Sequence, residues 1–127
     1  MEGSKMSSIP SDEDFARAKR LMRERYRNLD LVVMSVKQHF MPICQLSNIH
    51  ILVQRDVNFR VYVFFEKDAD LEDCKRNGIT DAIAQFVREE LERVGRGRKE
   101  ETSVAFEFDS HENVDRKFNG NYFNRLR

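Results

Sequence analysis

An antiparallel hairpin is the structure that the sequence indicates most strongly. Residues 48–54 (NIHILVQ) mostly alternate in character, and residues 59–65 (FRVYVFF) place apolar side chains on both faces. Alternation is the period of a half-buried strand, and a connection as short and polar as residues 55–58 joins neighbouring antiparallel strands. Tyr62 and Phe64 make the second face of the second strand apolar. Either both faces of the sheet are therefore covered, or one of them carries a partner site.

The region before the hairpin has the period of a helix. Apolar side chains recur at helical spacing over residues 15–40, and Ser11 precedes three acidic residues, a pattern typical of a helix N-terminus. We expect one long helix, or two helices broken near residues 28–30, ending before Pro42. The apolar run at residues 31–33 also fits the start of a strand, so helix and strand both remain open there.

Helices and one further strand are predicted after the hairpin. An acidic cap at Asp68 or Asp70 begins a short helix, and a longer amphipathic helix runs from near Thr80 to Gly95. Residues 102–108 then alternate as a third strand.

The order of these segments predicts an α+β domain. Its antiparallel sheet of three or four strands carries two main helices, in the order α-β-β-α-β. A tight-turn signal at residues 119–120 allows residues 121–126 to return as a fourth strand. Residues 1–10 are small and polar and are expected to be a leader, so residues 11–127 form the single domain.

Composition argues against several classes of function. The chain has 22 basic and 22 acidic side chains, whereas a general nucleic-acid binder needs a basic excess. No apolar stretch is long enough to span a membrane, and the N-terminus lacks the apolar core of a signal peptide, so a cytoplasmic protein is expected. Cys44 and Cys74 lie outside any metal-ligand pattern. Two reduced thiols are favoured over a disulfide, and neither metal nor cofactor is predicted.

Asp109, His111 and Glu112 form an acid–imidazole–acid cluster. Such a cluster can act as a general base or bind a divalent cation, which would indicate a small hydrolase-type enzyme. In the competing interpretation, Asp109 caps a turn and Glu112 begins a short helix over residues 112–117. No second cluster supplies further ligands, so capping and a non-enzymatic protein are preferred.

Two basic segments resemble phosphate-binding sites in composition. The six cations of residues 17–27 occupy two faces of the predicted helix, which favours a solvated surface over a nucleic-acid stripe. A cationic surface also suits an acidic protein partner. Residues 95–98 (GRGR) follow a helix and precede a strand, the reverse of a phosphate loop. A flexible connection is expected there.

Aromatic and guanidinium groups are concentrated in residues 122–127. Tyr122, Phe123 and Arg125 are residue types enriched in interface anchors. Packing of Tyr122 or Phe123 beneath the sheet is the competing account. If the two alternate, one points inward and the other is available to a partner, and the sequence leaves open which.

Several strings together resemble a group of small bacterial proteins. These strings are VNFRVYVFFEKDADLEDCKRNGI, EELERVGRG, FEFDSHENV and GNYFNRLR, and the similarity covers about residues 50–127. The group is similar to immunity proteins encoded beside secreted or contact-dependent toxins. The resemblance implies a cytoplasmic, non-enzymatic protein that binds a cognate toxin domain and occludes its active site. It assigns no residue a role.

Charge is compatible with that implication. Toxin nuclease domains are commonly basic, and acids that follow strands are expected to gather at one edge of the sheet. Together with the terminal aromatics, the predicted partner-binding residues are Asp68, Asp70, Asp109, His111, Glu112, Tyr122, Phe123 and Arg125. The alternative is a homodimeric regulatory or housekeeping domain whose Tyr62 and Phe64 face is the subunit interface. A monomer or a homodimer is expected.

Overall fold

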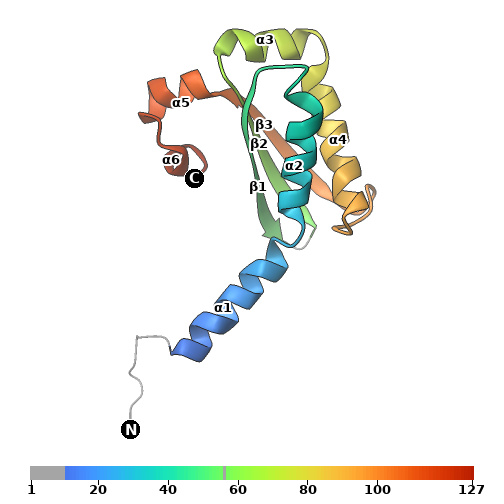
Figure 1. Cartoon of the computed structure of the whole chain (residues 1–127), viewed down its shortest axis with the longest axis vertical. Coiled ribbons are helices and arrows are strands. Elements are labelled where there is room, and N and C mark those ends of the chain that lie inside the picture. The colour runs from blue at the N-terminus through green and yellow to red at the C-terminus, as the bar shows by residue number, and fades with distance from the viewer. Residues whose placement is uncertain (1–10, 56) are drawn as a thin grey trace.

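A three-stranded mixed sheet is the centre of the fold. The computed structural model describes residues 11–55 and 57–127, and within them six helices accompany a sheet of strand order β1-β2-β3 (Figure 1). The elements in chain order are α1 (Asp12–Arg25), α2 (Leu29–Phe40), β1 (Leu46–Arg55), β2 (Asn58–Phe65), α3 (Asp68–Arg76), α4 (Ile79–Arg93), β3 (Ser103–Ser110), α5 (His111–Phe118) and α6 (Tyr122–Arg125). The α+β class is confirmed, and the described residues form six helices where two main helices and further short ones were predicted.

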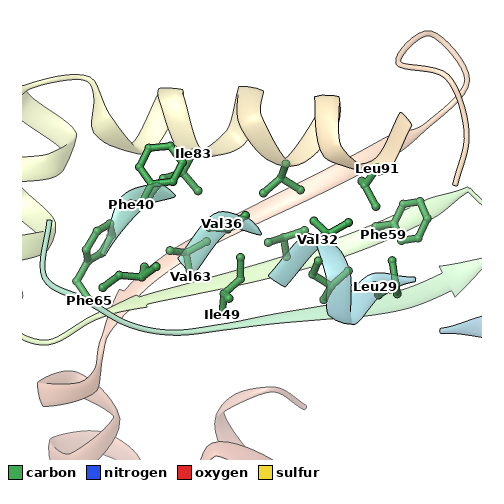
Figure 2. Packing of buried hydrophobic residues seen from close by; sticks show 14 of the residues in the cluster. Leu29, Val32, Val36, Phe40, Ile49, Phe59, Val63, Phe65, Ile83 and Leu91 are labelled. Atoms are coloured by element: carbon green, nitrogen blue, oxygen red, sulfur yellow. The ribbon is translucent and has the colours of Figure 1, made fainter. Parts of the chain in front are cut away.

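β1 and β2 form the predicted antiparallel hairpin. Ile49 lies opposite Val63, and Ile51 lies opposite Val61. Helices α2 and α4 cover the face that these residues share, and the main core lies between them (Figure 2). Removing this apolar surface from water is the chief stabilising term of the fold. Side chains fully shielded from solvent in this core are Val32, Val36, Val61, Val63, Phe65, Ile83, Val87 and Leu91.

β3 runs parallel to β2, so the prediction of a purely antiparallel sheet is wrong. Val61 is in register with Phe106, and Val63 with Phe108. Two helices, α3 and α4, connect β2 to β3 and return the chain to the end of the sheet where β2 began. A crossover of this kind pairs strands in parallel, whereas a tight turn would have paired them antiparallel.

The second face of the sheet is covered by α5 and α6. Tyr62 and Phe64 are almost fully buried there and pack with Val114 of α5. Phe118, Tyr122 and Leu126, all half-buried, complete this second cluster. The apolar character of both strand faces is thus explained by two cores. The face that the homodimer alternative used is occupied by the chain's own C-terminal helices.

The predicted fourth strand is a short helix, α6. Asn119 and Gly120 have positive φ values of 52° and 75°, and they end α5 instead of forming a hairpin turn. Asn121 then caps α6, because its side-chain oxygen accepts a hydrogen bond from the backbone N–H of Asn124. A left-handed residue followed by glycine is a frequent helix C-terminus, and here that function prevails over the turn signal.

The first helical region consists of two helices, and residues 29–40 are helical. Asn28, with a positive φ of 65°, separates α1 from α2. α2 buries Val32 and Val36 in the main core, whereas α1 buries no residue at all. α1 projects away from the sheet (Figure 1). The apolar stripe of α1 is therefore not a core stripe of this chain.

Arg96 corrects the prediction of a flexible loop after α4. Its side chain is only 8% exposed although it lies in the charged connection to β3. The guanidinium donates to the backbone carbonyls of Arg27 at 2.7 Å and Arg25 at 2.9 Å, and it lies 5.4 Å from the ring centroid of Phe59. Cations that donate to the last carbonyls of a helix stabilise its C-terminus. This arginine fastens α1 to the body.

The residues that precede α3 and α5 are not the predicted caps. Lys67, and neither acid, is the residue that precedes α3, and Asp70 accepts a hydrogen bond from its backbone N–H at 3.1 Å. Ser110, and not Asp109, caps α5. Helix boundaries depend on which backbone groups remain unpaired, and neighbouring polar residues compete for them.

Cys44 and Cys74 are free thiols. The Sγ atom of Cys44 donates to the carbonyl oxygen of Phe40 at 3.3 Å. Burial raises the pKa of Cys44 to about 11, and burial also raises the pKa of Cys74. A thiol with so high a pKa is a poor nucleophile at neutral pH.

Candidate functional site

The candidate site is the surface formed by α5 and α6, which we call the C-terminal platform. Ser110, the last residue of β3, begins it. Its Oγ accepts a hydrogen bond from the backbone N–H of Asn113 at 2.9 Å and donates to the carboxylate of Asp68. The same hydroxyl therefore caps α5 and ties its first turn to the N-terminus of α3.

Arg125 fastens α6 to the sheet. Its guanidinium donates to Asp109 at 2.8 Å and to Glu107 at 3.3 Å, and it lies 5.5 Å from the ring centroid of Tyr62. Only 15% of its side chain is exposed. Arg125 was predicted to meet a partner, and in the structure its charged group is engaged within the chain. Charge-assisted hydrogen bonds of this kind, half shielded from water, are among the stronger polar contacts.

The ion pair controls the protonation of Asp109. Burial by itself would raise the pKa of this carboxyl group. Hydrogen bonds from the Arg125 side chain, the Ser110 backbone and the Asn113 amide outweigh it, and the pKa lies below its ordinary value. Asp109 is consequently ionised over the physiological pH range, and it is an acceptor in this network.

His111 and Tyr122 pair on the inner side of the platform. The His111 Nδ1 atom lies 2.6 Å from the Tyr122 hydroxyl, and the two rings stack with centroids 5.7 Å apart. The other nitrogen, Nε2, is 3.5 Å from a carboxylate oxygen of Asp115. The Tyr122 ring meets Phe64 edge to face at 4.9 Å. Tyr122 is therefore the inward member of the terminal aromatic pair.

Phe123 is the outward member of that pair. Three quarters of its surface is exposed, the largest fraction among the exposed apolar side chains of the described residues. The guanidinium of Arg127 lies 5.6 Å from its ring centroid. An aromatic side chain held outward on a fixed helix beside a cation has the chemistry of an interface anchor.

The acids Asp68, Asp70 and Glu112 are all engaged at helix termini. Glu112 accepts from the backbone N–H of Asp68 at 3.0 Å, and Arg116 donates to the Asp68 carboxylate at 3.0 Å. A hydrogen bond from the Ser110 hydroxyl, with help from Arg116, lowers the pKa of Asp68. These acids lie at one end of the sheet, and each already has a partner in the chain.

The three residues of the enzyme alternative point to different partners. Asp109 contacts Arg125, His111 contacts Tyr122 and Asp115, and Glu112 contacts the start of α3. The residues that line the three surface grooves described for this chain include none of the three. Asp109 and His111 therefore do not share a reacting centre in this geometry.

Sequence reasoning missed several members of the platform. Glu107 lies two residues before Asp109, so the period of a strand puts both carboxylates on one face. That spacing could have predicted a pair of carboxylates that binds a cation, which in the structure is Arg125. Asp115 lies four residues after His111, one helical turn away, which would have signalled the pair. The contact between Asp68 and Ser110 had no such local signal.

Comparisons with known proteins do not identify a function, so the functional argument rests on the geometry described above. No family model matches the chain, and neither curated proteins nor solved structures give a match. Over residues 11–55 and 57–127, no helix is both long and apolar enough to cross a bilayer. In the same ranges, no three His, Cys, Asp or Glu side chains are grouped to hold a metal ion.

Proposed function

We propose that this protein is a non-enzymatic protein-binding module of the immunity type, which binds a toxin domain and occludes its active site. The observation that carries the proposal is the outward ring of Phe123, three quarters exposed, on a helix that Arg125 holds against the sheet. Hot spots of protein interfaces are typically aromatic or arginine side chains on such pre-organised supports.

Rigidity of the platform supports this function. α5 is tied to α3 through Ser110 and Glu112, and α6 is tied to the sheet through Arg125 and Tyr122. A surface that is already ordered loses little conformational entropy on binding, which favours tight occlusion. The same contacts leave Phe123 and Arg127 free for a partner.

The charge around the platform supports a basic partner. The segment 66–76, which lies beside the platform, contains five acidic and three basic side chains, an excess of two acids. Asp73, Glu72 and Asp115 each expose more than half of their side chain. Exposed carboxylates at the rim of an interface increase the association rate with a cationic surface.

Co-purification with the protein encoded by the neighbouring gene tests the proposal. We expect a stoichiometric complex and protection of cells that express that protein. Phe123→Ala should weaken the complex by about 2 kcal/mol, or roughly thirtyfold, if the ring is an anchor. Isothermal calorimetry or surface plasmon resonance measures the change.

Ile43→Ala is the matched control, because Ile43 is 57% exposed but follows α2, outside the platform. It should bind as tightly as the unaltered chain. A neighbouring protein that neither binds nor is neutralised refutes the toxin partner. Equal losses of binding affinity in Phe123→Ala and Ile43→Ala refute the platform as the binding surface.

A further inference from the structure

Helix α1 has a fixed direction although it buries none of its residues. Its last turn is held by three contacts with the body: Arg96 donates to two carbonyls at its C-terminus, and Arg25 donates to the carbonyl oxygen of Val53 at 2.9 Å. Asn28 adds a hydrogen bond from its side chain to the carbonyl of Val94 at 3.0 Å. α1 therefore projects as a braced arm, about 21 Å long for its 14 residues.

One side of this arm is apolar and exposed. At about 100° per residue, Phe15, Ala18 and Met22 fall on one stripe, with Leu21 beside it. Phe15 and Met22 are each 55% exposed, and Leu21 is 63% exposed. A stripe of this spacing is the usual contact surface between two helices.

The stripe continues into a groove at the base of α1. The groove has a volume of about 800 Å³ and lies between the end of α1, the start of α2 and β1. Its apolar lining consists of Met22, Tyr26, Leu29, Val33, Ile51 and Leu52. An apolar side chain that approaches along the stripe from a second helix would reach this groove at the end of its path.

Charges on α1 divide between its two ends in a self-complementary way. Asp12 and Asp14 lie in the first turn, and Arg23 and Arg25 lie in the last. Measured from Phe15, Asp12 and Arg23 fall at about +60° and +80°, while Asp14 and Arg25 fall at about −100° and −80°. The flank with Asp12 and Arg23 therefore carries an acid at the tip and a base near the body, whereas Arg25 on the other flank is bound to Val53.

We propose that α1 pairs antiparallel with α1 of a second copy of this chain. Between antiparallel helices each flank meets the same flank of the partner, so Asp12 of one copy faces Arg23 of the other. A two-fold axis beside Ala18 makes the contact isologous, as is usual for homodimers. Full overlap of the helices brings Phe15 of each copy to the groove of the other. This surface is separate from the C-terminal platform (Figure 1), so the inference does not depend on the proposed function.

The same charges disfavour a membrane surface as the occupant. A basic amphipathic helix binds anionic lipid when its whole polar side is cationic. Here three acids, Asp12, Glu13 and Asp14, occupy the first turn of the helix and interrupt its cationic side. A second α1 places Arg23 against Asp12, and a bilayer does not.

Light scattering and analytical ultracentrifugation of the full chain test the inference. We expect a concentration-dependent homodimer. Phe15→Glu should weaken it by about a hundredfold or more, because the charge would be buried in both symmetric contacts. Phe123→Glu is the matched control, since it changes an exposed aromatic outside α1 and should leave dimerisation unaltered. Circular dichroism and thermal unfolding at low concentration verify that each variant is folded.

An exchange of charges distinguishes specific antiparallel pairing of α1 from non-specific hydrophobic association. Arg23→Asp and Asp12→Arg should each weaken the dimer by about three- to tenfold, because like charges then face one another. The double variant, which carries both changes in one chain, should restore the unaltered affinity. A double variant that dimerises no more tightly than the two single variants refutes the antiparallel arrangement.

Two further outcomes overturn the inference. One is a chain that is still monomeric at about 1 mM, where association would be too weak to matter. The other is a monomer that binds vesicles of anionic lipid through Phe15 and Met22, which would assign α1 to a membrane surface. Crosslinking of an introduced cysteine, Ala18→Cys, between copies would support the two-fold axis directly.

Discussion

The N-terminal helix α1 and the C-terminal platform contain similar side chains and have opposite environments. Both combine aromatic residues with arginines. In the platform, Arg125 and Tyr122 are engaged with the sheet, whereas in α1 the ring of Phe15 is more than half exposed. The difference arises because β2 has a second apolar face within reach of the C-terminal segment. The chemistry of aromatic and guanidinium groups does not by itself decide whether they are buried. They are buried where the fold leaves an apolar surface for them to pack against.

Each region is also braced by one arginine, in different ways. Arg125 pairs with carboxylates, Asp109 and Glu107, so its role depends on charge. Arg96 donates to backbone carbonyls of α1 and has no carboxylate partner among its hydrogen bonds in the described chain. Protonation of a carboxylate partner weakens only the contacts of Arg125. The two ends of the molecule should therefore respond differently to truncation and to acid.

The largest effect is expected at Phe64, on which the platform rests. Phe64→Ala removes a fully buried ring and should lower the free energy of unfolding by about 3–5 kcal/mol. Urea denaturation at low protein concentration measures it. Phe64→Leu, which keeps most of the volume, should cost clearly less. A loss below about 1 kcal/mol for the alanine variant would mean that the second core contributes little.

A smaller effect is expected at Arg125. Arg125→Met leaves the shielded carboxylate of Asp109 without its cation and should cost about 2–3 kcal/mol. Arg125→Lys keeps the charge but loses the two-pronged geometry, and it should recover only part of that loss. Chemical denaturation and amide exchange of α6 provide the readout. Exchange that remains slow in α6 of the methionine variant would contradict the role of Arg125 as its fastener.

Acid should erase this contribution. The pKa of Asp109 in the folded chain lies below the value near 3.9 of an unfolded aspartate, so the unfolded state binds the proton more readily. The stabilisation is present above about pH 4 and disappears as the pH falls through the folded pKa. Asp109→Asn should therefore be least stable relative to the unaltered chain near pH 7, and the two should converge at low pH. A constant difference across the titration would exclude the ion pair as its cause.

The smallest effect is expected in α1. Simultaneous alanine substitution of Phe15, Leu21 and Met22 should change the free energy of unfolding of the monomer by no more than about 0.5 kcal/mol, since none is buried. The measurement requires a concentration at which the chain is monomeric, because a dimer would add stability by mass action. A large loss under those conditions would show that α1 packs on its own body in solution.

Local patterns predicted the hairpin, most of the helices and the Ser11 cap of α1. Alternation in residues 48–54 and 59–65 is enough to put Ile49 and Val63 on the core-facing sides of their strands, because a strand has a period of two. The expectation of one inward aromatic at the C-terminus was also correct in kind, and Tyr122 is that residue. Whether the predicted binding residues meet a toxin remains a prediction, since none of these observations tests it.

The direction of β3 and the identity of α6 could not be read from local patterns. Residues 103–110 alternate equally well in a parallel or an antiparallel sheet, and the two helices between β2 and β3 decide which. The tight-turn signal at residues 119–120 allowed residues 121–126 to return as a strand. They fold as a helix because Asn119 and Gly120 turn the chain over Tyr62 and Phe64, where a short helix covers the face.

The sequence by itself determined which segments have the period of a strand or a helix, and which side chains are apolar on each face. Those properties are set by neighbours within a few residues. Only the tertiary structure decided that Arg125 is bound to Asp109 while Phe123 is exposed to solvent. It also decided that the apolar stripe of α1 is exposed. Burial depends on contacts between Asp109 and Arg125, or Phe64 and Tyr122, that lie far apart along the chain. A periodic pattern shows that a surface is apolar, and the fold determines what covers it.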